Sequence, residues 1–107
     1  MNSVDEQAKI LGTREFTVES WAAASQLERA RMTASFLHQY DATDLDRSGI
    51  IKLLGRPTAY YNYDSNAAYI VGPTTVSSKY GDGYLLVFET DKDNGNVDRV
   101  FFVPDVE

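Results

Sequence analysis

The sequence contains no cysteine and a single histidine, His38. The first absence excludes disulfides, cysteine-ligated zinc and a thiol nucleophile. One histidine excludes a multi-histidine metal site and leaves one candidate base for a nucleophile–histidine–acid arrangement. His38 falls near the C-terminal end of a predicted helix, where a histidine more often interacts with the helix dipole. We therefore predict no cofactor, no metal site and no catalytic residue, so the protein is not expected to be an enzyme.

Positive charge and long apolar runs are also scarce. The 10 basic residues stand against 16 acidic ones, which gives a formal net charge of −6. Nucleic-acid phosphates and anionic membranes attract clustered Lys and Arg, so this balance argues against both as partners. No apolar run approaches the ~18 residues of a membrane span. We expect neither nucleic-acid binding nor membrane insertion.

The N-terminal residues lack the basic and apolar regions of a signal peptide. Two locations stay open at this point. The protein is cytoplasmic if Met1 is native, and periplasmic or in the cell envelope if this is the exported part of a longer protein.

The length of 107 residues corresponds to one domain, and 43% hydrophobic residues are ordinary for a globular protein. Residues 1–15 are polar and lack a sustained period, which predicts a flexible arm. Residues 16–107 are expected to form the single domain.

Two helices are predicted in the first half of the chain. Residues 19–40 are rich in helix formers and contain no Gly or Pro. Their apolar residues fall on two sides, so this helix is either buried between two surfaces or broken into two pieces. A shorter helix follows, with Asp46 placed to cap its start, and with Gly55 and Pro57 marking its end.

Strand patterns dominate the second half. Aromatic and β-branched runs cover residues 60–63, 68–71, 84–90 and 97–103. Asn94-Gly95 marks the tip of a hairpin between the last two runs. Because the helices come first and the strands last, we predict an α+β fold, with an N-terminal helix pair packed on one face of an antiparallel β-meander of about four strands.

Acidic residues suggest two kinds of site. Asp91, Asp93 and Asp98 lie around Gly95, as acidic residues do in a calcium-binding loop. Such a loop needs Gly at its sixth position and a bidentate acid at its twelfth. Counted from Asp91, these positions hold Asn96 and Phe102. This segment is therefore predicted to be a charged hairpin tip. Paired carboxylates for hydrolysis need a cleft, which the sequence alone does not place. A small enzyme with a carboxylate site stays as an alternative.

Tyrosine is the one compositional oddity, because six of the seven tyrosines lie within residues 60–84. Aromatic pairs across strands stabilise ordinary sheets. Tyrosine is also enriched in interface hot spots, and a sheet with helices on one face leaves its other face available. We predict that a protein partner binds the helix-free face through Tyr61, Tyr63, Tyr69 and Tyr84.

One pattern extends over roughly residues 16–103. Its most specific part is the short helix that ends in Leu53-Leu54-Gly55-Arg56-Pro57. The other segments of the pattern are Phe16, Trp21, Arg31-Met32, Phe36-Leu37, Leu45-Asp46, Ile50, Leu85–Phe88 and Asn94–Val97.

This pattern resembles small bacterial domains of the SmpA/OmlA type, the outer-membrane-assembly small-lipoprotein family, which is related in fold to β-lactamase-inhibitor protein. The resemblance implies a helix pair on a four-stranded antiparallel sheet, and protein–protein contact rather than catalysis. The family's lipid-modified N-terminal cysteine has no counterpart here, and the loop at residues 71–83 has no match.

The sequence thus predicts a non-catalytic protein–protein interaction module, and the resemblance implies the soluble part of a bacterial envelope protein. A second hypothesis is a cytosolic acidic regulator or inhibitor of a basic protein partner. An uncovered sheet face or edge strand can also be buried in a homodimer.

Overall fold

The structure, a computed structural model, describes residues 2–107. Its helical part comprises α1 (Val4–Leu11), α2 (Val18–Ala23), α3 (Gln26–Gln39), the 3₁₀ turn η1 (Ala42–Asp44) and α4 (Arg47–Leu54). Its strands are β1 (Ala67–Val71), β2 (Ser77–Ser78), β3 (Gly81–Asp82), β4 (Tyr84–Thr90) and β5 (Val97–Val103). The predicted α+β class, with the helices N-terminal to the strands, is confirmed.

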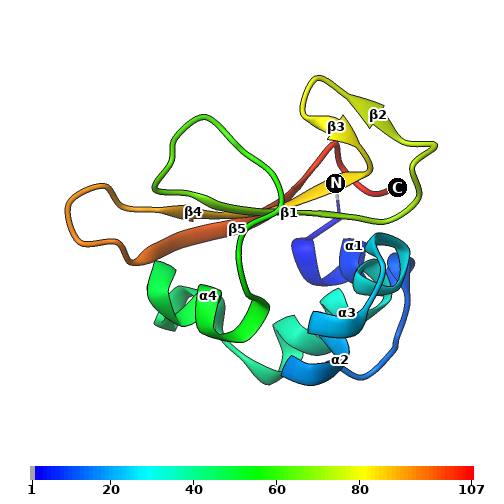
Figure 1. Cartoon of the computed structure of the whole chain (residues 1–107), viewed down its shortest axis with the longest axis horizontal. Helices are drawn as coiled ribbons and strands as arrows, with labels where there is room; N and C mark the ends of the chain where they lie inside the picture. Colours follow the sequence, from blue (N-terminus) through cyan, green and yellow to red (C-terminus); the bar gives the residue numbers. More distant parts are fainter. Residues whose placement is uncertain (1) are drawn as a thin grey trace.

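The sheet has three antiparallel strands in the order β1-β4-β5. The helices lie on one side of it, while the connection before β1 and the small β2–β3 ribbon rise on the other side (Figure 1). Of the four predicted strands, the run at residues 60–63 forms a loop instead. Asn62 turns the chain there with a φ of 58°, and the Asn66 side-chain amide donates to the Tyr61 carbonyl at 2.9 Å.

The long helix predicted over residues 19–40 is broken into two pieces, α2 and α3. The break has a local cause in Ser25, which is the N-cap of α3. Its hydroxyl accepts from the Glu28 backbone N–H, and the Glu28 carboxylate accepts from the Ser25 N–H, each at 3.2 Å. This capping box satisfies N–H groups that a continuous helix would satisfy with carbonyls.

The structure corrects the prediction of a flexible arm at residues 1–15, because helix α1 lies there. Ser3 and Glu6 form a capping box at its start. The buried Ala8 packs in the main core, and the Gln7 side-chain oxygen accepts from the Val106 N–H at 2.7 Å. The Ser3-x-x-Glu6 pattern is a local signal of a helix start that the sequence displays. An eight-residue helix also needs packing against the domain to be stable.

Helix α4 agrees with its predicted boundaries. The Asp46 carboxylate accepts from the Gly49 N–H at 2.8 Å, and Gly55 ends the helix with a φ of 80°. Ile50 and Leu54 are its buried residues.

The main core lies between the helices and the sheet. Edge-to-face aromatic contacts run through it from helix to strand, with Phe36 and Tyr69 each packing against Phe88 at ring-centroid distances of 5.9 and 6.1 Å. In residues 2–107 no helix has both the length and the apolarity that a membrane crossing requires.

Candidate functional site

The face of the sheet that points away from the helices carries a second apolar cluster. Because strand residues alternate in direction, the neighbours of the core residues of β1, β4 and β5 point to this side. Six partly buried side chains form its outer layer, which we call the aromatic face: Ala59, Tyr61, Ile70, Tyr80, Phe101 and Val103. They lie over three fully buried residues, Ala68, Leu85 and Val87.

Tyr61 lies at the centre of the aromatic face. Its ring centroid is 5.2 Å from that of Tyr80 and 5.4 Å from that of Phe101. These contacts join the loop at residues 58–66, the β2–β3 ribbon and strand β5. Three segments that are far apart in sequence therefore present their aromatic rings together.

The four tyrosines predicted to form one surface do not lie together. Tyr61 belongs to the aromatic face, and Tyr63 on the same loop is 53% exposed. Tyr69 on β1 is completely buried in the main core between the sheet and the helices, and Tyr84 packs against that core. The strand register explains this correction, because Tyr84 lies opposite Val71, which shares the orientation of Tyr69.

Tyr69 has a structural position instead. Its hydroxyl donates to the Gly55 carbonyl at 2.7 Å, which ties the end of α4 to β1. Burial raises the pKa of Tyr69, because the phenolate is poorly solvated in the core.

Tyr80 and Phe101 belong to the aromatic face but were not predicted. Phe101 could have been found, because it alternates with the core residue Phe102 along β5. Tyr80 could not, because its place depends on how the ribbon folds back over the sheet.

Three cations lie close to aromatic rings on and beside this face. Lys79 lies 5.2 Å from the Tyr80 ring centroid, and the Arg99 guanidinium lies 4.5 Å from that of Phe101. Lys92 lies 3.5 Å from the ring centroid of Tyr63. Arg99 also forms an ion pair with Glu89 at 2.8 Å, which raises the pKa of Arg99. The arrangement combines apolar rings with hydrogen-bond donors.

A groove of about 500 Å³ lies elsewhere, between α1, the end of α3, η1 and β5. Its acidic residues are Asp5, Asp41 and Asp98, and the exposed His38 also lines it. The Asp41 carboxylate accepts from the Thr43 N–H and hydroxyl at 3.1 and 2.7 Å. Asp41 thus caps η1. Arg99 and apolar side chains also line the groove, so its three carboxylates face one arginine, and we call it the acidic groove.

No cluster of three or more His, Asp or Glu side chains suited to a metal ion occurs within residues 2–107. Comparisons with family models, with curated proteins and with solved structures give no significant match to this chain. The resemblance to SmpA/OmlA-type domains therefore stays a prediction.

Proposed function

We propose that this protein is a non-catalytic protein–protein interaction module whose contact surface is the aromatic face. The observation that carries the proposal is the packing of Tyr61 against both Tyr80 and Phe101 on the side of the sheet that the helices leave uncovered. Tyrosine supplies a large contact area and a polar hydroxyl with few rotatable bonds.

The aromatic face is also held in place before any partner arrives. Ala68, Leu85 and Val87 beneath it are fully buried, so its rings rest on a packed layer. Rings that already contact one another lose little further rotamer freedom on binding, which leaves more of the contact energy available for affinity. The nearby cations fit a partner that brings acidic or carbonyl groups to the rim.

The proposed setting as the soluble part of a bacterial envelope protein is supported by the resemblance of the short helix and the final strands to SmpA/OmlA-type domains. A second copy of this chain is one partner that such a face can accept.

The acidic groove favours a second candidate function, that of an acidic regulator or inhibitor of a basic protein. Asp5, Asp41 and Asp98 face the same 500 Å³ space, and neither ion pair in residues 2–107 involves them. Binding at this groove would weaken steeply with added salt, whereas apolar contact at the aromatic face would change little.

The test uses two matched double variants as bait for affinity capture from the source cells. Tyr61→Ser/Tyr63→Ser alters the aromatic face and its neighbour, while Ile10→Ser/Leu27→Ser removes exposed apolar side chains from helices α1 and α3. Circular dichroism establishes that both variants fold. Each captured protein is then purified and titrated against all three forms.

The proposal predicts a partner that binds the wild type and the helix variant with similar affinity and binds the tyrosine variant at least about tenfold more weakly. Equal affinity for all three forms would contradict the aromatic face as the contact surface. A salt-sensitive partner that tolerates both variants would favour the acidic groove.

A further inference from the structure

A cleft of about 300 Å³ lies on the helix side of the molecule, between α2, α3 and the end of α4. All three charged residues that line it are cations, namely Arg29, Lys52 and Arg56. The whole chain has more acidic than basic residues, yet no acidic side chain among residues 2–107 lines this space. Neither of the two ion pairs in residues 2–107 involves these cations. We call this space the cationic cleft.

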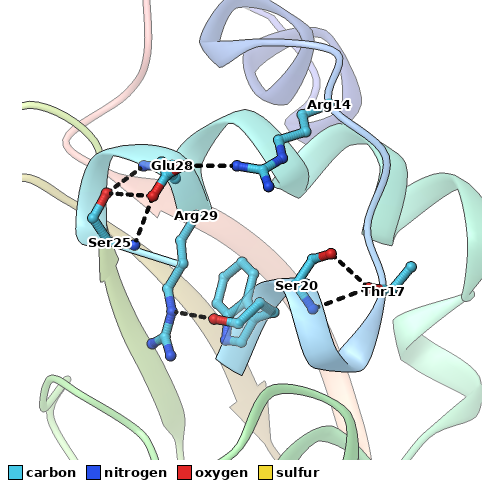
Figure 2. A network of polar contacts seen from close by, with 7 residues as sticks. Arg14, Thr17, Ser20, Ser25, Glu28 and Arg29 are labelled. Atoms are coloured by element: carbon cyan, nitrogen blue, oxygen red, sulfur yellow. Dashed lines mark hydrogen bonds and ion pairs between the residues drawn. The ribbon is translucent and has the colours of Figure 1, made fainter. Parts of the chain in front are cut away.

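Arg29 is fixed in one position by Trp21. Its Nε donates to the Trp21 carbonyl at 3.0 Å, and its guanidinium carbon lies 4.9 Å from the Trp21 ring centroid. In Figure 2 the terminal nitrogens of the Arg29 guanidinium extend past this hydrogen bond. They lie apart from the polar network of Ser25, Glu28 and Arg14. These nitrogens have no hydrogen-bond partner within residues 2–107, although burial already lowers the pKa of Arg29.

The walls between the cations are apolar and firmly anchored. Val18 and Leu53 line the cleft beside Trp21. The Trp21 indole donates to the Leu54 carbonyl at 2.9 Å, which joins the α2 wall to the α4 wall. The Tyr69 hydroxyl bonds the next carbonyl, that of Gly55. These two hydrogen bonds hold the walls of the cleft together, and in residues 2–107 no carboxylate forms an ion pair with its cations.

We propose that the cationic cleft binds a small amphiphilic anion, a carboxylate or phosphate head group on a short aliphatic chain. The terminal nitrogens of Arg29 present a fork that matches two oxygens of such a head group. Lys52 and Arg56 add charge from the end of α4, and the aliphatic chain lies along Val18 and Leu53. An anion would also reduce the repulsion among the three cations that line the cleft.

This inference does not rest on the proposed function, because the cationic cleft and the aromatic face lie on opposite sides of the sheet. Tyr61→Ser/Tyr63→Ser is expected to leave ligand binding unchanged. A failure of one proposal therefore leaves the other standing.

Trp21 provides the assay, because it is the single tryptophan of the chain and lines the cleft. Its fluorescence is followed while decanoate, decyl phosphate, inorganic phosphate or decyltrimethylammonium is added to the full chain below the micelle concentration. Amide NMR shifts then locate the binding. We expect saturable binding of decanoate, decyl phosphate or both, with shift changes at the Trp21 indole N–H and at residues 53–56.

The variant Lys52→Gln/Arg56→Gln removes two exposed cations of the cleft. It should weaken binding of the anionic probe by about tenfold or more, because hydrogen bonds to charged groups are lost. Lys9→Gln/Arg31→Gln removes two exposed cations from α1 and α3, away from the cleft, and should leave the affinity unchanged.

The two anionic amphiphiles distinguish a carboxylate from a phosphate head group, and preference for either supports the proposal. Equally tight binding of decyltrimethylammonium would overturn the role of the cations. Inorganic phosphate that binds as tightly as the amphiphiles would overturn the role of the apolar walls. The absence of saturable binding by both anionic amphiphiles would overturn the site itself.

Discussion

The indole Nε1 of Trp21 donates a hydrogen bond to the backbone carbonyl of Leu54 at 2.9 Å, across a separation of 33 residues. Both side chains are almost completely buried. The bond joins the end of α4 to α2, and it satisfies one of the carbonyls that a helix leaves unpaired at its C-terminus.

Replacing this indole should therefore be costly. Trp21→Phe leaves the Leu54 carbonyl without its donor and opens a cavity in the core. We expect the free energy of unfolding to fall by about 2–4 kcal/mol. Urea unfolding followed by circular dichroism measures the change. A loss well under 1 kcal/mol would show that the bond and the packing contribute little.

Tyr69 provides a prediction at alkaline pH. Burial raises its pKa above the ordinary value of 10.0, so the folded state keeps the protonated hydroxyl while the unfolded chain ionises. The stabilisation is complete below about pH 10 and declines as the pH rises toward the raised pKa. The free energy of unfolding of the wild type should thus fall more steeply above pH 10 than that of Tyr69→Phe. Parallel slopes would contradict this role.

At neutral pH the same Tyr69→Phe variant should lose only about 1 kcal/mol, because a single hydrogen bond to the Gly55 carbonyl disappears and Gly55 is exposed to water. Urea unfolding at pH 7 measures this loss, and the ring itself should stay in place.

The capping box of α3 predicts behaviour at acid pH. The Ser25 N–H donates a hydrogen bond to the Glu28 carboxylate, and the Arg14 side chain donates another. These bonds hold the pKa of Glu28 below its ordinary value of 4.5. Stabilisation by Glu28 is thus present above about pH 4.5 and is lost as the pH falls through the lowered pKa. Stability curves of the wild type and Glu28→Gln should converge in acid. A constant gap between the curves down to pH 2 would rule out the ionised capping box as the cause.

Local signals made part of the fold predictable. The caps at Asp46 and Gly55 and the Asn94-Gly95 tip all act within a few residues, and α4 and the β4–β5 hairpin lie where they were expected. The break between α2 and α3 agrees with one of the two alternatives that the sequence allows for residues 19–40. These features follow from backbone chemistry that a sequence displays directly.

Long-range packing made the rest unpredictable. Helix α1 has a local capping box, but it depends on packing against α3 and β5. The burial of Tyr69 depends on the register of β1 with β4. Residues 60–63 are typical of a strand, but they form a loop because Asn62 turns the chain and the Asn66 side chain bonds the Tyr61 carbonyl. Of the four predicted site residues, Tyr61 alone therefore lies in the aromatic face.

Helix α1 should behave as part of the domain. Ala8 is completely buried, so Ala8→Glu would bring a charge into a packed space and should lower the free energy of unfolding by more than about 2 kcal/mol. Ile10→Glu places the same charge on a residue of α1 that is 52% exposed, and it should have little effect. Equal effects of the two changes in urea unfolding would indicate that α1 contributes nothing to stability.

Substitutions in the aromatic face and beside it should differ in their effect on the free energy of unfolding. Tyr63→Ser alters a half-exposed ring and is expected to change stability by less than about 0.5 kcal/mol. Tyr61→Ser removes contacts with Tyr80 and Phe101, and should cost about 1–2 kcal/mol. Thermal unfolding of the two single variants gives the comparison. The reverse order would mean that Tyr61 is not the centre of the cluster.

Photo-crosslinking in the source cells tests the proposed function most directly. A photoreactive phenylalanine analogue replaces Phe101 of the aromatic face in one protein and the exposed Ile10 of α1 in another. The proposal predicts one discrete crosslinked protein from position 101, either a partner or a second copy of the chain, and none from position 10. Identical crosslinking patterns from the two positions, or no crosslink from position 101, would contradict a protein-binding face on this side of the sheet.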